Sequence, residues 1–134
     1  DVAALIADVS RRPAASGRLR YGLSAFVIAR ETDAEAQDEH ARLLDLSRRD
    51  DALRAETRAR TDAASVMFAK TDAASSRHVG TNGGTAAGLV GSYATVAERI
   101  RAFHAAGIDL FMLQFQPFEA EMRRFAEQIL PRVR

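Results

Sequence analysis

The sequence predicts an α/β protein in which about three parallel strands are flanked by helices. Two short apolar runs, residues 19–29 and 108–115, have the length and composition of buried strands. They alternate with longer stretches whose apolar residues recur at helical spacing, and capping residues mark where those helices begin. Strands that alternate with helices form βαβ units, which build a parallel sheet.

The N-terminal part of the chain is predicted to be a helix followed by a strand. Apolar side chains at helical spacing predict a helix over residues 2–12, and Pro13 and Gly17 then interrupt the pattern. Residues 19–29, LRYGLSAFVIA, are apolar at both odd and even positions. That pattern is typical of a parallel strand that is buried on both faces.

The second helix has the clearest N-terminal signal. Thr32 or Asp33 can cap it, because either side-chain oxygen can accept a backbone N–H of the first turn. Glu35, three residues after Thr32, completes a capping box. The helix is expected to extend to about Leu46. An excursion at about 47–86 follows, first charged and then rich in small polar residues and glycine, and we expect it to be mobile.

A short strand and a helix come next. Residues 87–90 predict the strand, Gly91 a turn, and Ser92 the N-cap of the helix. Apolar residues at helical spacing extend that helix to residue 106, and Gly107 suits its C-terminal end.

The chain ends in a last strand and a last helix. Residues 108–115, IDLFMLQF, predict another buried strand. Pro117 suits the first turn of a helix, and the apolar positions that follow predict that this helix reaches Pro131.

Composition excludes several classes of function. There are 19 basic and 18 acidic residues, and a formal net charge of +1 gives no basic footprint for nucleic acid. The chain has no cysteine, which excludes disulfides and thiolate chemistry. No apolar run approaches the roughly 20 residues of a membrane span, and no signal peptide is recognisable. We therefore expect a cytoplasmic protein without a membrane partner.

The whole chain, residues 1–134, is expected to be one segment of a single domain. Three strands are few for an independent parallel sheet, because its edges and part of its apolar faces stay uncovered. The first residue is Asp1 rather than methionine. Together these observations predict that an N-terminal portion is missing.

Three stretches carry a more specific pattern. They are YGLSAFVIARETDAEA at 21–36, GGTAAGLVGSYATVAERIRAFHAAGIDLFML at 83–113 and FEAEMRRFAEQILPRV at 118–133. A strand with Arg-Glu-Thr before a helix, then LVG-x-x-x-x-VAERI and a GID strand, resembles the C-terminal part of the bacterial-luciferase-like flavin-dependent monooxygenases. The dimethyl sulfone and alkanesulfonate monooxygenases are the most similar groups.

This resemblance implies a fold, a reaction and partners. The fold would be the C-terminal portion of a (β/α)8 TIM barrel, with the strands of this chain as the sixth, seventh and eighth. The reaction would be oxygenation of a small organosulfur compound, a sulfone or a sulfonate, with C–S cleavage. It would use O2 and reduced FMN from a separate flavin reductase. The chain alone is expected to be inactive, and to form a homo-oligomer or pair with its missing N-terminal portion, because a closed barrel needs roughly 250 residues.

The resemblance also points to site residues. Where the alkanesulfonate enzymes place Arg and His on the sixth strand, this chain has Ser24 and Phe26. Asn82 replaces an Arg before the paired glycines of the excursion, and Gln116 replaces a Tyr after the eighth strand. A sulfonate anion favours guanidinium groups and charge-assisted hydrogen bonds. The neutral residues at the three cationic positions, Ser24, Phe26 and Asn82, therefore predict a neutral sulfone as substrate.

Other candidates follow from position in the fold. Gln114 lies at the C-terminal end of the last strand, where barrel enzymes keep their chemistry, and is a further candidate for substrate binding. Ser24 and Phe26 are expected to face the barrel interior, where core packing is the competing explanation. Gly91 and Ser92 open a helix and could bind an anion, which makes them candidates for cofactor binding, although most such pairs are simply caps. No residue is assigned a catalytic role, and no metal site is expected.

Three other functions stay open at this point. Two belong to the same superfamily: a pyrimidine-ring-opening flavin monooxygenase, whose LVGSYA segment is similar, and a deazaflavin-dependent oxidoreductase. The third is a non-catalytic fragment or assembly module.

Overall fold

A computed structural model describes residues 2–12, 19–50, 56, 59–60, 78–80 and 84–134 of the chain. Within these residues the protein is a mixed α/β structure with parallel strands and flanking helices, as the sequence predicts. The described strands do not close into a barrel.

The strands form two parallel pairs that share one segment of chain. β1 (Tyr21–Phe26) pairs with β4 (Ile108–Gln114), and β2 (Ile28–Arg30) pairs with β3 (Val90–Ser92). Only Val27 separates β1 from β2. The predicted strand at 19–29 is therefore present, but it changes its partner near its C-terminal end.

The two partners lie along opposite edges of this segment. The N–H of Val27 donates to the carbonyl oxygen of Gln114 at 3.1 Å, and the N–H of the next residue, Ile28, donates to that of Leu89 at 2.9 Å. Successive N–H groups of an extended strand point to opposite edges. The 21–30 segment consequently lies between β4 and β3.

This order corrects one expectation. Sixth, seventh and eighth strands of a barrel would lie side by side in that sequence, with the 90–92 strand in the middle. In the structure β4 instead pairs directly with β1. β4 therefore lies along the edge of β1 where the preceding strand of a barrel would lie. The described residues before Tyr21 form a helix and supply no such strand. An unpaired edge of β1 would leave its backbone N–H and C=O groups without hydrogen bonds, and pairing with β4 provides those bonds.

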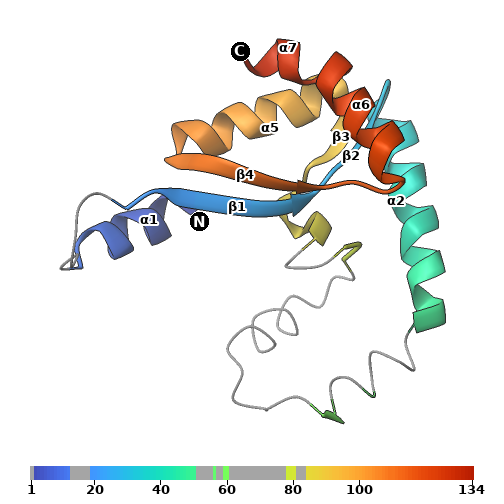
Figure 1. The fold of residues 1–134 in the computed structure, drawn as a ribbon, viewed down its shortest axis with the longest axis horizontal. Coiled ribbons are helices and arrows are strands. Elements are labelled where there is room, and N and C mark those ends of the chain that lie inside the picture. Colours follow the sequence, from blue (N-terminus) through green and yellow to red (C-terminus); the bar gives the residue numbers. More distant parts are fainter. Residues whose placement is uncertain (1, 13–18, 51–55, 57–58, 61–77, 81–83) are drawn as a thin grey trace.

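Helices surround the strands. They are α1 (Val2–Ser10), α2 (Asp33–Ser47), α5 (Tyr93–Ala105), α6 (Phe118–Gln128) and α7 (Leu130–Val133), with short 3-10 turns η1 (Arg48–Asp50) and η2 (Gly84–Ala87). Figure 1 shows α5, α6 and α7 together on one side of β1 and β4, and α2 beyond the end where those strands finish.

The predicted caps are confirmed where α2 and α5 begin. The Thr32 hydroxyl accepts the N–H of Glu35, and the Glu35 carboxylate accepts the N–H of Thr32, which completes the capping box. Ser92 caps α5 by accepting the N–H of Thr95. Both helices therefore begin where the local sequence places them.

Two predicted boundaries were wrong. The strand expected at 87–90 is β3, Val90–Ser92, so Gly91 lies within a strand and pairs with Ala29. The turn comes earlier, at Gly88, whose φ of 73° is the left-handed conformation that glycine adopts freely. The last helix was expected to run unbroken to Pro131, but α6 ends at its C-cap Ile129 and α7 continues as a separate turn.

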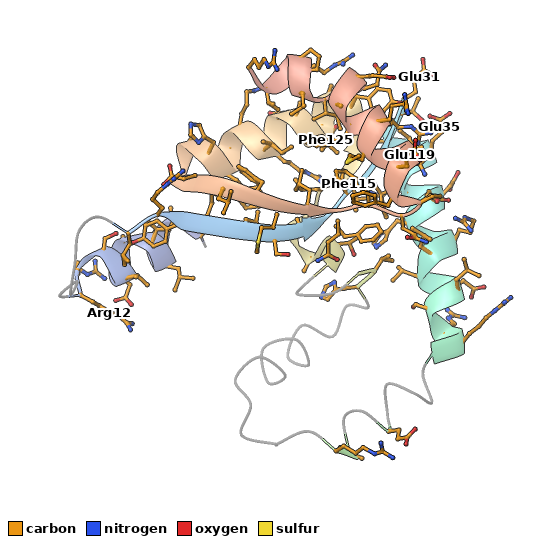
Figure 2. The ribbon with its side chains drawn as sticks, in the orientation of Figure 1. Arg12, Glu31, Glu35, Phe115, Glu119 and Phe125 are labelled. Carbon is orange, nitrogen blue, oxygen red and sulfur yellow. The ribbon has the colours of Figure 1, made fainter. Side chains whose placement is uncertain are left out.

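The main core lies between the strands and the helices α5 and α6. Its buried members are Ala25, Val27, Ala29, Leu89, Val96, Ala97, Ile100, Phe125 and Ile129. The rings of Phe115 and Phe125, 5.5 Å apart between centroids, pack in this layer (Figure 2). The odd-numbered residues of the 25–29 segment all face this core.

The even-numbered residues of the same segment face the other way. Phe26 and Ile28 form a second cluster with Ala36 of α2 and Val90 of β3, and Leu43 and Val79 pack against it. The end of the 21–30 segment is therefore buried on both faces, by α5 and α6 on one and by α2 on the other. Such burial is typical of parallel strands.

The first half of the even-numbered face is open. Gly22 and Ser24 of β1 pair with Leu110 and Met112 of β4, and these two apolar side chains are 55% and 58% exposed. The sequence predicted that part of the apolar faces would stay uncovered, and this strip confirms it.

Of the excursion expected at about 47–86, the structure describes the end of α2, η1, three isolated residues, residues 78–80 and the start of η2. The predicted mobility of the remainder lies outside the described residues. Among the helices that are described, none has the length and apolarity that a membrane crossing requires.

Candidate functional site

Three of the predicted site residues come together where β1 and β4 end. Phe26 and Gln114 are register partners across the two strands, and Ser24 lies two residues before Phe26 on the same face. The side-chain amide of Gln114 donates to the Ser24 hydroxyl at 3.4 Å, a long hydrogen bond. Carboxyl ends of parallel strands are where α/β enzymes place their binding groups.

Gly80 closes one side of this group. Its φ of +88° favours glycine, and a β-carbon built on it would lie 2.6 Å from Cδ2 of Phe26 and 3.1 Å from Oε1 of Gln114. The backbone at residue 80 therefore approaches the strand ends as closely as it can. Phe26 is buried there, and for this residue the explanation as core packing is supported.

The open side of the group is apolar. Ser24 is a register partner of Met112, and Gly22 is a partner of Leu110, so the exposed strip continues directly from the Ser24–Gln114 pair. A surface that combines two exposed apolar side chains with a hydroxyl and an amide can bind a small molecule that is apolar in part and accepts hydrogen bonds in part.

Of the other two candidates, only Gln116 is among the described residues, and it lies beyond the end of β4. Gln116 is exposed, in the link between β4 and α6, two residues beyond Gln114. Asn82 lies outside the described residues. The roles predicted for both stay predictions.

The helix start at Gly91 and Ser92 already holds an anion that the chain itself supplies. The Asp33 carboxylate accepts the N–H of Ser92 at 2.7 Å and the hydroxyl of Thr95 at 3.2 Å. Hydrogen bonds from the Ser92 backbone, and then from Thr95, lower the pKa of Asp33 below its ordinary value. A β-carbon on Gly91 would lie 2.7 Å from this carboxylate, so glycine is needed for Asp33 to approach.

A polar cluster that the sequence did not predict lies beside Gly80. The ring nitrogen Nε2 of His40 is 3.1 Å from the Thr85 hydroxyl oxygen, which also accepts the N–H of Val79 at 3.2 Å. Burial lowers the pKa of His40, and the positive charge of His78 lowers it further. The only sequence signal was the spacing of His40 from Ala36, four residues apart on the buried side of α2.

A network of ion pairs joins β2 to two helices. The Arg30 guanidinium contacts Glu121 of α6 at 2.8 Å and Glu39 of α2 at 3.3 Å. Glu121 is almost fully buried and also contacts Arg124 at 2.9 Å. Hydrogen bonds from Arg42 lower the pKa of Glu39. We interpret this network as structural, because every charge in it has an opposite partner.

The chemistry available at the strand ends is neutral hydrogen bonding. Ser24 and Gln114 carry no charge, and their described neighbours on this face are glycine or apolar residues. Among the described residues, no group of three or more His, Cys, Asp or Glu side chains could hold a metal ion. The described side chains at the strand ends can therefore offer neutral hydrogen bonds to a molecule.

Fold and candidate site together define an α/β protein with parallel strands and a neutral hydrogen-bonding pair at their carboxyl ends. Residues 1–110 match the sequence family described as luciferase-like monooxygenase. The chain belongs to this family, whose enzymes are generally flavin-dependent. The match ends within β4, before α6.

The described residues fit one part of a flavin better than the other. The strip of Leu110 and Met112 beside the Ser24–Gln114 pair suits a flat ring system with polar edges. The phosphate fits less well at Gly91 and Ser92, because the Asp33 carboxylate already accepts the Ser92 N–H there and would repel a second anion.

Proposed function

We propose that the protein containing this chain is a two-component monooxygenase, dependent on reduced FMN, that oxidises a small neutral organosulfur compound such as a sulfone with C–S cleavage. The observation that carries the proposal is the Ser24–Gln114 pair, a hydroxyl and an amide next to exposed apolar side chains. Family membership supports the flavin and the oxygenation.

The absence of charge at this point favours a sulfone over a sulfonate. An anion that leaves water for a confined site needs cationic partners, and without them it costs several kcal/mol. A sulfone has no net charge, and its oxygens require only hydrogen-bond donors. Ser24 and Gln114 offer such donors, whereas the strand positions that would hold Arg and His in the sulfonate enzymes are Ser24 and Phe26.

The roles of the side chains follow from their positions. The Ser24 hydroxyl accepts the Gln114 amide and can donate its own proton to a substrate oxygen. Phe26 is the register partner of Gln114 and is buried in the second core cluster. The backbone of Gly80 lies close to both side chains. Reduced FMN, supplied by a separate reductase, would activate O2 when bound.

A competition assay tests the substrate. The protein containing this chain is supplied with reduced FMN, O2 and equal concentrations of a small sulfone and a sulfonate of similar size, and the release of sulfinate and sulfite is measured. We expect the sulfone to be consumed preferentially. A preference for the sulfonate would overturn the assignment of a neutral substrate. Turnover of neither compound, together with turnover of a pyrimidine or of a deazaflavin-dependent substrate, would move the function to those branches of the superfamily.

A further inference from the structure

Thr85 links the Val79–Gly80 segment to α2 through polar contacts, in addition to the apolar packing of Val79. The Thr85 hydroxyl accepts the N–H of Val79, and the Thr85 N–H donates to the carbonyl oxygen of Val79 at 3.0 Å. Residues 79 and 85 are thus joined by two hydrogen bonds. The same hydroxyl meets Nε2 of His40, so one buried group joins three elements.

The hydrogen-bond inventory favours one state of the ring. The Thr85 hydroxyl can donate its own proton to Nε2 of His40 while its oxygen accepts the Val79 N–H. This requires the neutral ring with its proton on Nδ1. A protonated ring would present an N–H to the hydroxyl instead, and the buried Thr85 proton would have to find another acceptor.

We infer that His40 is a positioning residue, which in its neutral form holds the Val79–Gly80 segment, through Thr85, against Phe26 and Gln114, and which releases that segment when it gains a proton. The inference rests on the proposed function only in assigning Gln114 to the site. The contact between Gly80 and the Phe26–Gln114 pair stands on the structure alone.

Few charges act on His40. The positions three and four residues away on α2 are Ala36, Gln37, Leu43 and Leu44, which are uncharged. The described parts of η2 and β3 have no titratable side chain. Arg30 of β2 is engaged with Glu39 and Glu121. Residues 78–80 contribute His78, whose positive charge opposes protonation of His40.

Nuclear magnetic resonance tests the inference without substrate or flavin, so its failure and that of the proposed function are distinguishable. The His40 ring, the Val79 amide and the Gln114 side-chain amide are followed as the pH falls from 8 to 5 in the protein containing this chain. We expect the Val79 and Gln114 signals to shift with the same midpoint as the His40 ring.

Three variants separate cause from coincidence. His40→Gln can accept the Thr85 proton without titrating, so the Val79 and Gln114 signals should stay near their high-pH positions throughout. Thr85→Val should leave His40 titrating while the Gln114 signal no longer follows. His78→Gln should raise the midpoint of all three groups, because a repelling charge is removed.

The control is His104→Gln on α5, whose Nδ1 contacts the carbonyl oxygen of Ile108 instead. It should leave the Val79 titration unchanged. The inference is overturned if the Gln114 signal does not move with His40 in the unmodified protein, or if its titration persists in His40→Gln. A substitution that prevents folding does not remove the test, because the titration of the unmodified protein decides it.

Discussion

Gly80 and Phe26 are packed so closely that a β-carbon at residue 80 would lie 2.6 Å from Cδ2 of the Phe26 ring. Real β-carbons do not approach other atoms so closely, and the buried ring cannot move away without disturbing its neighbours in the second core cluster. Two segments that are more than 50 residues apart in the sequence are thereby held at a fixed separation beside Gln114.

The first prediction concerns this contact. Gly80→Ala should destabilise the fold by about 2–5 kcal/mol, because it adds a left-handed alanine, about 1–2 kcal/mol, to an overpacked contact, about 1–3 kcal/mol. Gly88→Ala is the matched control: Gly88 has a φ of +73°, but its nearest neighbour is the flexible end of Arg99 at 3.6 Å. Urea unfolding should show the larger loss for Gly80→Ala. Equal losses would mean that the Phe26 contact contributes nothing.

The second prediction concerns the buried carboxylate of Glu121. Glu121→Gln should destabilise the protein by about 1–3 kcal/mol, less than the roughly 3–5 kcal/mol of a fully broken buried pair, because Arg30 retains Glu39. Glu119→Gln removes an exposed ion pair with Arg123 on the same helix and should change stability by less than about 0.5 kcal/mol. Chemical unfolding of both variants measures the difference. If the two losses are alike, the network is not a structural link between β2 and α6.

Local features of the sequence were sufficient for the helix starts. The capping box of Thr32 and Glu35 and the cap at Ser92 depend on groups within one helical turn, and each was predicted correctly. The positions of Ser24 and Gln114 were also accessible, because both lie near the carboxyl ends of strands that parallel pairing brings together.

Features that depend on distant partners were not accessible in this way. Nothing between Tyr21 and Arg30 indicates that the pairing partner changes at Val27, because the exchange is set by which strand reaches each edge. Gly91 was wrongly predicted to form a turn. Glycine is needed there because the Asp33 carboxylate lies against it, and Asp33 is far away in the sequence. The pairing of His40 with Thr85 could not be predicted, because the two residues are 45 positions apart in the sequence.

The third prediction is a loss of stability in mild acid. The pKa of His40 is lower in the folded protein than in the unfolded chain, so the unfolded chain binds a proton more readily as the pH falls. The contribution of neutral His40 is complete above the ordinary histidine range. It is lost as the pH falls from that range through the folded pKa.

Thermal unfolding at pH values from 8 to 5 measures this loss. His40→Gln should flatten the dependence in that window, and Glu39→Gln should not, because carboxylates titrate at lower pH. An unchanged pH profile in His40→Gln would show that other groups determine acid stability.

The last prediction concerns substrate charge. Ser24→Ala removes a neutral hydrogen bond, about 0.5–1.5 kcal/mol, and should lower kcat/KM for a sulfone roughly 2- to 12-fold. Ser10→Ala is the control: it also loses a hydroxyl contact, with Tyr21 at 2.8 Å, but lies on α1 away from the strand ends, and should leave kcat/KM unchanged.

Ser24→Arg places a guanidinium beside exposed Met112, where there is room for it. A charge-assisted contact of about 1.5–3 kcal/mol should then improve the kcat/KM ratio of sulfonate to sulfone by at least roughly 10-fold. Steady-state kinetics with both substrates decides the matter, and a ratio unaltered by Ser24→Arg would remove Ser24 from the substrate site.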